Sequence, residues 1–242
     1  FYEEKTGFLI EVHMNIMGHD NDMYTKMGEP FEDVFENIQI QEICGVPVAI
    51  MNHTKNFIFL VLHALKHFAL SGIGMRQMLD IGLYQETFES DIDWVQVKQI
   101  LEECSALGFL GDLQSISTRY LGVVLKNKFQ SVKPDVLLQD IIADGVFGQH
   151  ASADEVAMSI TLSTAGYQSK GIMKWIRAAF PSKNRMIEVA PYLADKPWMV
   201  PVEWVKRWGR FVAKTKEYEG NLLLESVKKS EKRKRLLKMY GH

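Results

Sequence analysis

Apolar and polar residues alternate along the beginning of the chain, from Gly7 to Ile16. Successive residues of a β-strand point to opposite faces, so this alternation predicts a half-buried strand. Two further short segments, Ile38–Ile43, in which isoleucine alternates with polar residues, and the apolar Pro47–Met51, flank Cys44-Gly45-Val46. Two short runs around a connection that contains glycine predict a β-hairpin. Between these strands we expect turns over Gly18–Pro30 and a short amphipathic segment around Phe31–Asn37.

After Asn52, a residue suited to capping a helix, the apolar positions recur every three or four residues. This period predicts successive helices, as in a bundle. The predicted helices are Lys55–Ser71, Gly74–Phe88, Trp94–Leu107, Leu110–Lys126, Pro134–Asp144, Gly171–Ala179, Val202–Lys216 and Leu222–Tyr240. The fold class is therefore α+β. Residues 1–53 provide a few strands, and residues 54–242 form a large, mainly helical region with a basic C-terminal helix.

The composition is that of a folded globular protein. The 242 residues are 47% hydrophobic and 24% charged, which excludes disordered, collagen-like and disulfide-scaffold classes. The two cysteines, Cys44 and Cys104, fit a reducing compartment, so we expect a cytoplasmic protein. The longest apolar stretch, Asn56–Leu70, carries three basic or imidazole side chains and is shorter than the ~20 residues of a membrane span, so it predicts a buried helix.

Charge is distributed unevenly along the chain. Residues 206–242 contain twelve Lys and Arg against four Asp and Glu, a formal charge of +8, whereas the preceding residues carry −10. Lys228 and Lys229 belong to a basic helix that could bind an anionic partner such as nucleic acid, lipid or a phosphate-rich substrate. A solvated terminal helix explains the same pattern.

Glu11 and His13 lie on the same face of the first predicted strand, opposite Val12 and Met14. Carboxylates gathered on adjacent strands hold divalent cations for phosphoryl transfer, because hard oxygen ligands suit Mg²⁺. Glu11 alone cannot complete such a site. A strand with one solvent-facing side gives the same alternation.

His63 and His67 are four residues apart on a predicted helix, a spacing that can chelate a transition metal. Asp80, on the next helix, could provide a third ligand. The surrounding apolar residues also fit two packing histidines in a core.

Asp91-Ile92-Asp93 resembles the Asp-x-Asp pair of metal-dependent transferases. That pair belongs on a strand, whereas Ser90 and Asp91 precede a helical pattern. We therefore expect this cluster to cap a helix.

Several short motifs occur in an order that resembles the bacterial uncharacterised nucleotidyltransferase family, within the DNA polymerase beta-like nucleotidyltransferase superfamily. The resemblance spans most of the chain. The motifs are Ile10-Glu11-Val12-His13, the hairpin, Leu62-His63-Ala64-Leu65-Lys66-His67-Phe68, Arg76-Gln77-Met78-Leu79-Asp80-Ile81, Ile92-Asp93-Trp94, Gly145-Val146-Phe147-Gly148, and the segment from Phe180-Pro181 to Trp204.

The resemblance implies that residues 1–53 are the C-terminal strands of a nucleotidyltransferase core. It also implies transfer of a nucleotidyl group from an NTP, with Mg²⁺ as cofactor, to an acceptor that the sequence leaves open. It places Glu11 at the third metal carboxylate with His13 beside it, while Arg76, Lys228 and Lys229 could meet anionic substrate. The superfamily's Gly-Ser followed by a strand-borne Asp-x-Asp does not occur in these residues. Either it lies before Phe1, which we expect, or the protein has lost catalysis, and in both cases we expect this chain alone to be inactive. Two alternatives stay open: a non-catalytic helical module that binds an anionic partner through its basic tail, and a metalloenzyme that uses His63, His67 and Asp80.

Overall fold

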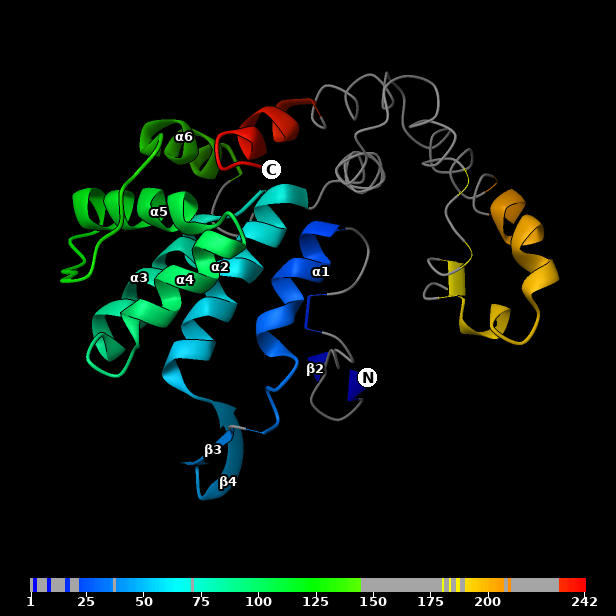
Figure 1. The fold of residues 1–242 in the computed structure, drawn as a ribbon, viewed down its shortest axis with the longest axis horizontal. Helices are drawn as coiled ribbons and strands as arrows, with labels where there is room; N and C mark the ends of the chain where they lie inside the picture. Colours follow the sequence, from blue (N-terminus) through cyan, green and yellow to red (C-terminus); the bar gives the residue numbers. More distant parts are fainter. Residues whose placement is uncertain are drawn as a thin grey trace.

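The fold is that of a mainly helical α+β protein with two small antiparallel sheets (Figure 1). It is seen in a computed structural model that describes residues 2–3, 8–9, 16–17, 22–36, 38–70, 72–144, 180, 183, 186–187, 190–206, 209 and 231–242. Strand β1 (Tyr2–Glu3) pairs with β2 (Phe8–Leu9), and β3 (Ile38–Ile43) pairs with β4 (Val46–Met51). The α+β prediction is confirmed.

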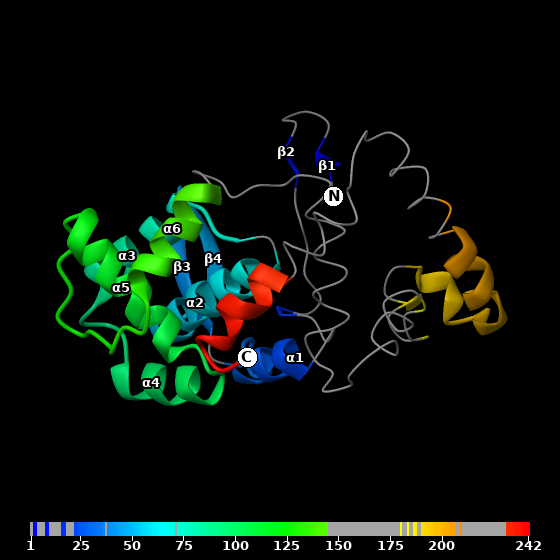
Figure 2. The same ribbon diagram turned by 90° about the horizontal axis from the view of Figure 1, so that it is seen from above.

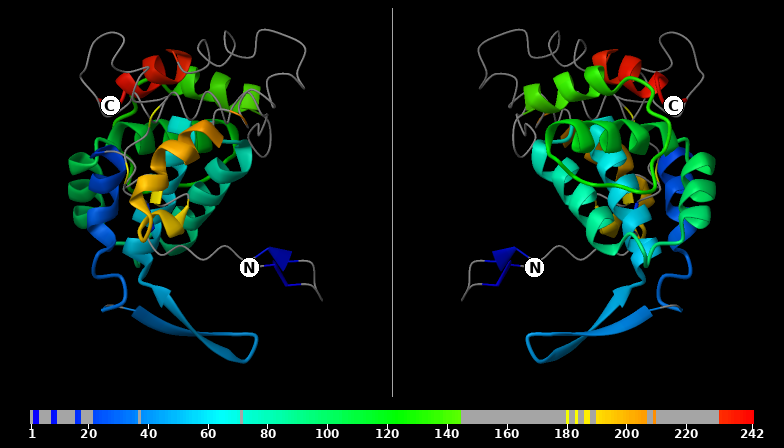
Figure 3. Two further views of the ribbon diagram at one scale, coloured as in Figure 1. Left: turned by 90° about the vertical axis from the view of Figure 1, so that its right-hand side faces the viewer. Right: turned by 90° about the vertical axis from the view of Figure 1, so that its left-hand side faces the viewer.

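The antiparallel pairing of β3 and β4 confirms the predicted β-hairpin. Cys44 and Gly45 both have positive φ, 51° and 79°, at its turn. A two-residue hairpin turn with this backbone matches the twist of the strands. The hairpin forms its own two-stranded sheet and extends away from the helices (Figure 3). All of β3 is exposed, so the alternation in this strand does not mark a buried face.

Five helices begin within three residues of their predicted starts, and the largest difference is at α5, which begins three residues early. They are α2 (His53–Leu70), α3 (Met75–Phe88), α4 (Trp94–Glu103), α5 (Leu107–Tyr120) and α6 (Pro134–Asp144). Helix α4 ends earlier than predicted because the chain turns at Ser105, which has φ of 52°. Helix α5 also ends earlier than predicted, and Gly122 has a φ of 71° two residues later.

The expectation of turns over Gly18–Pro30 is wrong in part. Helix α1 (Asp22–Gly28) lies within this range, followed by the 3-10 helix η1 (Glu29–Phe31). Tyr24 and Met27 are buried against the core, three residues apart on one face of α1. A helix of only seven residues shows too few turns for its period to stand out from the surrounding polar residues.

Helix α2 lies at the centre of the core and packs against α3 and α4. Phe57, Val61, Leu65 and Phe68 recur at helical spacing along it and are fully buried. Helix α5 packs against α3 and α6, so the helices form one continuous core (Figure 2). This core fixes the positions of the side chains discussed below.

The described end of the chain joins this core. Residues 231–238 are helical, within the predicted Leu222–Tyr240, and Leu236, Leu237 and Tyr240 are buried in the core. A second, small apolar cluster contains Met186, Leu193 and Val200, near the 3-10 helices η2 (Pro191–Leu193) and η3 (Pro197–Met199). Residues 200–206 are helical, in keeping with the start of Val202–Lys216, while Gly171–Ala179 lies outside the described residues. Within the described ranges, every helix is too short or too polar to cross a membrane.

Candidate functional site

The carboxylate predicted to bind a metal is not placed by the structure. Glu11 and His13 lie outside the described residues, as do Lys228 and Lys229. The beginning of the predicted strand is described, since Phe8 pairs with Glu3 and Leu9 with Tyr2.

Arg76 and Asp80 lie on the outer surface of α3. Arg76 Nε is 4.0 Å from Asp80 Oδ2, and both side chains are more than half exposed. An exposed pair one helical turn apart stabilises a helix only slightly. Its position leaves the Arg76 guanidinium accessible to an anion in solvent.

His63 and His67 face each other along α2. Their Nε2 atoms are 2.7 Å apart, so one ring donates a hydrogen bond to the other, and the stacked rings have centroids 4.6 Å apart. Phe59 packs edge-on against His63. The described residues contain no group of three or more His, Cys, Asp or Glu side chains that could hold a metal ion. The two histidines are therefore brought together without Asp80, and the described residues do not fit a Mg²⁺ or a three-ligand zinc site.

The Asp91-Ile92-Asp93 cluster caps a helix, as expected, although Asp93 rather than Ser90 or Asp91 is the capping residue. The Asp93 carboxylate accepts hydrogen bonds from the backbone N–H groups of Val95 and Gln96 at 3.0 and 3.1 Å. Its own backbone N–H donates to Thr54 Oγ1 at 2.9 Å. The bond to Thr54 holds the start of α4 against α2.

The described part of the basic tail is docked on the helical body. Lys232 Nζ lies 2.6 Å from Asp140 Oδ1, and Arg233 forms an ion pair with the other oxygen of the same carboxylate. Arg233 also lies over the Phe68 ring, 5.3 Å from its centroid. Asp140 on α6 is almost completely buried. Its negative charge is paired with these two cations and so offsets part of the positive charge of the tail. Figures 1 and 2 show residues 231–242 beside α6.

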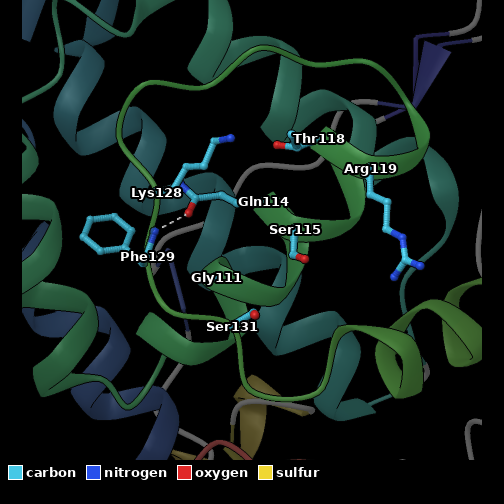
Figure 4. Close-up of a pocket in the computed structure, with 8 residues that line it drawn as sticks. All are labelled: Gly111, Gln114, Ser115, Thr118, Arg119, Lys128, Phe129 and Ser131. Atoms are coloured by element: carbon cyan, nitrogen blue, oxygen red, sulfur yellow. Dashed lines mark hydrogen bonds between the residues drawn. The ribbon is translucent and has the colours of Figure 1, made fainter.

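A cavity of about 350 Å³ lies between α5 and the segment that follows it. We call residues 121–133 the post-α5 loop. Figure 4 shows the cavity with α5 on one side and this loop on the other. The lining residues are Gly111, Gln114, Ser115, Thr118, Arg119, Lys128, Phe129 and Ser131.

Two buried glutamines hold the middle of the post-α5 loop. Gln114 Oε1 on α5 accepts a hydrogen bond from the Phe129 backbone N–H at 2.8 Å. The carbonyl oxygen of Asn127 accepts bonds from the side-chain amides of both Gln85 and Gln114, at 2.7 and 3.0 Å. Gln114 also donates to Gln85 Oε1, which links α5 to α3. Buried amides are stable in a core only when paired in this way.

Glu89, just beyond α3, holds the preceding part of the loop. Its carboxylate accepts hydrogen bonds from the backbone N–H groups of Lys126 and Asn127, at 2.8 and 2.6 Å. Burial acts to raise the pKa of the Glu89 carboxyl, but the bonds from Asn127 and Lys126 outweigh it and hold this pKa below its ordinary value. The carboxylate is therefore ionised at neutral pH.

Asp112 holds the end of the loop from the other side of α5. Its carboxylate is fully buried and accepts bonds from the backbone N–H groups of Val132 and Lys133, at 2.5 and 3.0 Å. It also accepts a bond from the Tyr240 hydroxyl at 2.7 Å. Burial, together with the bond to Asp112, raises the pKa of Tyr240, so this phenol stays protonated as a donor. Asp112 thus joins the loop, α5 and the end of the chain.

Gly111 allows the loop to lie close to α5. A Cβ atom at this position would lie 2.3 Å from the Gln130 carbonyl oxygen, a distance that no side chain permits. The sequence contained one usable sign of this arrangement: Gly111, Asp112 and Gln114 interrupt the apolar face of a predicted helix. It could not say what these residues bind, because their partners in the loop lie 13 to 21 residues away in a segment without regular structure.

The family comparison agrees with the motifs from Ile10 to Trp94, whereas the later motifs lie beyond the matched residues. The model of the uncharacterised nucleotidyltransferase family matches residues 1–122, half of the chain. The matched part contains Glu11, the hairpin and helices α1 to α5. No curated protein and no solved structure matches the chain.

Proposed function

This chain belongs to the uncharacterised nucleotidyltransferase family, and we propose that it takes part in metal-dependent transfer of a nucleotidyl group from an NTP to an acceptor. The family match over residues 1–122 is the observation that carries this proposal. The match supports a nucleotidyltransferase-like function in general. The metal, the nucleotide and the residue roles below belong to the proposal.

Glu11 is the residue that we propose as a metal-binding carboxylate, with His13 as a neighbouring polar group. In this chemistry Mg²⁺ neutralises charge on the transferred phosphoryl group. The described residues contain no cluster that could complete the metal site. We therefore assign no step of the transfer to them, and further ligands would have to lie outside the described ranges.

The helical body serves, in this proposal, as the scaffold beside the acceptor. Arg76 stands exposed on α3 and is available to an anionic substrate group. Lys228 and Lys229 are proposed for the same role from the tail. Their neighbours Lys232 and Arg233 pair with Asp140, which docks this end of the chain on the body.

The test is a Glu11→Gln substitution in the complete protein. We expect incorporation of label from α-³²P-labelled ATP, GTP, CTP and UTP, with Mg²⁺ and a cell extract as the source of acceptors. Loss of the carboxylate charge should lower incorporation by about 100-fold or more, without a change in the unfolding midpoint, because one metal ligand is removed.

Glu42→Gln is the matched control. Glu42 is an exposed carboxylate in β3, so the same chemical change there should leave incorporation unaltered. Full activity of Glu11→Gln, or the absence of incorporation by the unmodified complete protein, would refute the proposal.

A further inference from the structure

We propose that the cavity between α5 and the post-α5 loop binds the phosphate group of a small phosphorylated molecule. The lining combines two cationic side chains, Arg119 and Lys128, with three hydroxyl groups. Cations and hydroxyl donors around a small hollow are the groups that recognise phosphate oxygens. This binding does not depend on Glu11 or on nucleotidyl transfer.

Lys128 is the principal cation of the cavity. Its ammonium group has neither an ion-pair nor a hydrogen-bond partner in the part of the chain that the structure describes. Figure 4 shows its side chain extending from the loop toward Thr118 on α5. A bound phosphate would give this charge a partner without breaking an existing contact.

Arg119 provides the second cation. Its guanidinium lies 3.5 Å from Asp135 at the start of α6, and both side chains are largely exposed. An exposed ion pair of this kind is weak and screened by salt. A phosphate dianion can therefore compete with Asp135 for the guanidinium.

The hydroxyl groups of Ser115, Thr118 and Ser131 lack hydrogen-bond partners among the described residues. The Thr118 oxygen is moreover shielded from solvent, and an unpaired polar atom in such a position is uncommon in folded proteins. All three residues line the cavity, so each hydroxyl can donate to a phosphate oxygen.

The carboxylates that hold the loop do not oppose an anion strongly. Backbone N–H groups surround the Glu89 and Asp112 carboxylates, which offset their negative charge locally. Residues 121–133 contain Lys126, Lys128 and Lys133 and no acidic residue. Asp135 remains as an exposed carboxylate at the rim, in its pair with Arg119.

The site is also ordered before any ligand arrives. The bonds from Gln85, Gln114, Glu89 and Asp112 fix the loop backbone around the cavity. Binding then costs little ordering of the chain. A volume of about 350 Å³ lies at the small end of ligand pockets, which suits a sugar phosphate rather than a polymer.

The direct test is calorimetric titration of the full chain with three probes: inorganic phosphate, ribose 5-phosphate and ribose. We expect saturable binding of the two phosphorylated probes and none of ribose. Absence of saturable phosphate binding, or binding of ribose as tight as that of ribose 5-phosphate, overturns the proposal.

Matched lysine variants locate the site. Lys128→Ala should weaken binding of ribose 5-phosphate about tenfold, because a charge-assisted hydrogen bond is lost. Lys126→Ala, which removes an exposed charge from the same loop but not from the cavity lining, should change the affinity by less than about twofold. Equal losses in both variants would show diffuse attraction to the loop and contradict a site.

Thr118→Val gives a second readout. It keeps the side-chain shape and removes the hydroxyl, so it should weaken ribose 5-phosphate binding by about threefold or more while the thermal midpoint stays the same or rises. Unchanged affinity in both Thr118→Val and Ser115→Ala would remove the hydroxyl groups from the account and count against the proposal.

Discussion

The β3–β4 hairpin and the post-α5 loop differ in a way that separates regular structure from fixed position. The hairpin has a full antiparallel register from Ile38 opposite Met51 to Ile43 opposite Val46, yet its side chains are largely exposed. The loop contains no helix or strand. Its backbone is nevertheless held by buried side chains of α5, by Gln85 on α3 and by Glu89 just after α3. Polar side chains on a helical core can therefore fix the backbone of a segment that has no regular structure of its own.

The largest effect is expected for Asp112→Ala. This substitution leaves the N–H groups of Val132 and Lys133 and the Tyr240 hydroxyl without their acceptor. We expect a loss of about 3 kcal/mol in the free energy of unfolding, measured in urea, because a buried hydroxyl and two part-buried backbone N–H groups become unpaired. The control Asp135→Ala removes an exposed carboxylate and should stay within about 0.5 kcal/mol. Equal effects of the two variants would mean that Asp112 does not hold the loop.

Gly111→Ala should have the next largest effect. The added Cβ would overlap the Gln130 carbonyl, so the loop must move away from α5. We expect about 2 kcal/mol of destabilisation by urea unfolding. Gly28→Ala is the control, since a Cβ there meets Met17 Cβ at an ordinary 3.8 Å and should cost nothing. An unaltered stability of Gly111→Ala would show that the loop does not lie so close.

Cys104 is buried in the core and Cys44 is exposed in the hairpin, so the pH dependence of stability should differ between these two regions. Burial raises the pKa of the Cys104 thiol from 9.0 to about 11. The unfolded chain therefore loses this proton first, so the contribution of Cys104 is complete below pH 9 and is lost as the pH rises through 11. Raising the pH from 8 to 10 should therefore lower the free energy of unfolding by about 1 kcal/mol through Cys104.

Urea unfolding of Cys104→Ala and Cys44→Ala at both pH values isolates this effect from other titrating groups. The pH dependence should shrink in Cys104→Ala and stay unchanged in Cys44→Ala, because Cys44 is exposed at the hairpin turn. The same pH dependence in both variants would argue against a buried Cys104 thiol.

The smallest effect is expected in the hairpin itself. Ile40 is 67% exposed in β3, and threonine suits a strand about as well as isoleucine. Ile40→Thr should change the free energy of unfolding by no more than about 0.5 kcal/mol in urea. A loss above about 1 kcal/mol would mean that this face of the hairpin is covered in solution.

Prediction from sequence worked where a pattern is local and repeated. The helices from α2 to α6 and the hairpin are visible because their period or alternation extends over many residues. Helix α1 was missed because Tyr24 and Met27 reveal their role only when they pack against distant parts of the core. The exposure of β3 was likewise unpredictable, since alternation cannot say whether any element covers a strand.

The candidate site shows the same limit more sharply. The His63 and His67 pair follows from helical spacing, and the capping role of the Asp91-Ile92-Asp93 cluster follows from the helix start. The cavity does not, because it depends on side chains of α3 and α5 binding the backbone of the post-α5 loop. Glu11 remains a prediction from the motif that contains it.

The most direct measurement is a titration of the ¹⁵N-labelled protein with inorganic phosphate, followed by the backbone amide signals. If the fixed loop forms a phosphate site, the signals of Ser115, Thr118, Lys128 and Ser131 should shift with one saturating curve, while those of β3 and β4 stay in place. Shifts that are spread over the hairpin as well as the loop, or that never saturate, would contradict the account.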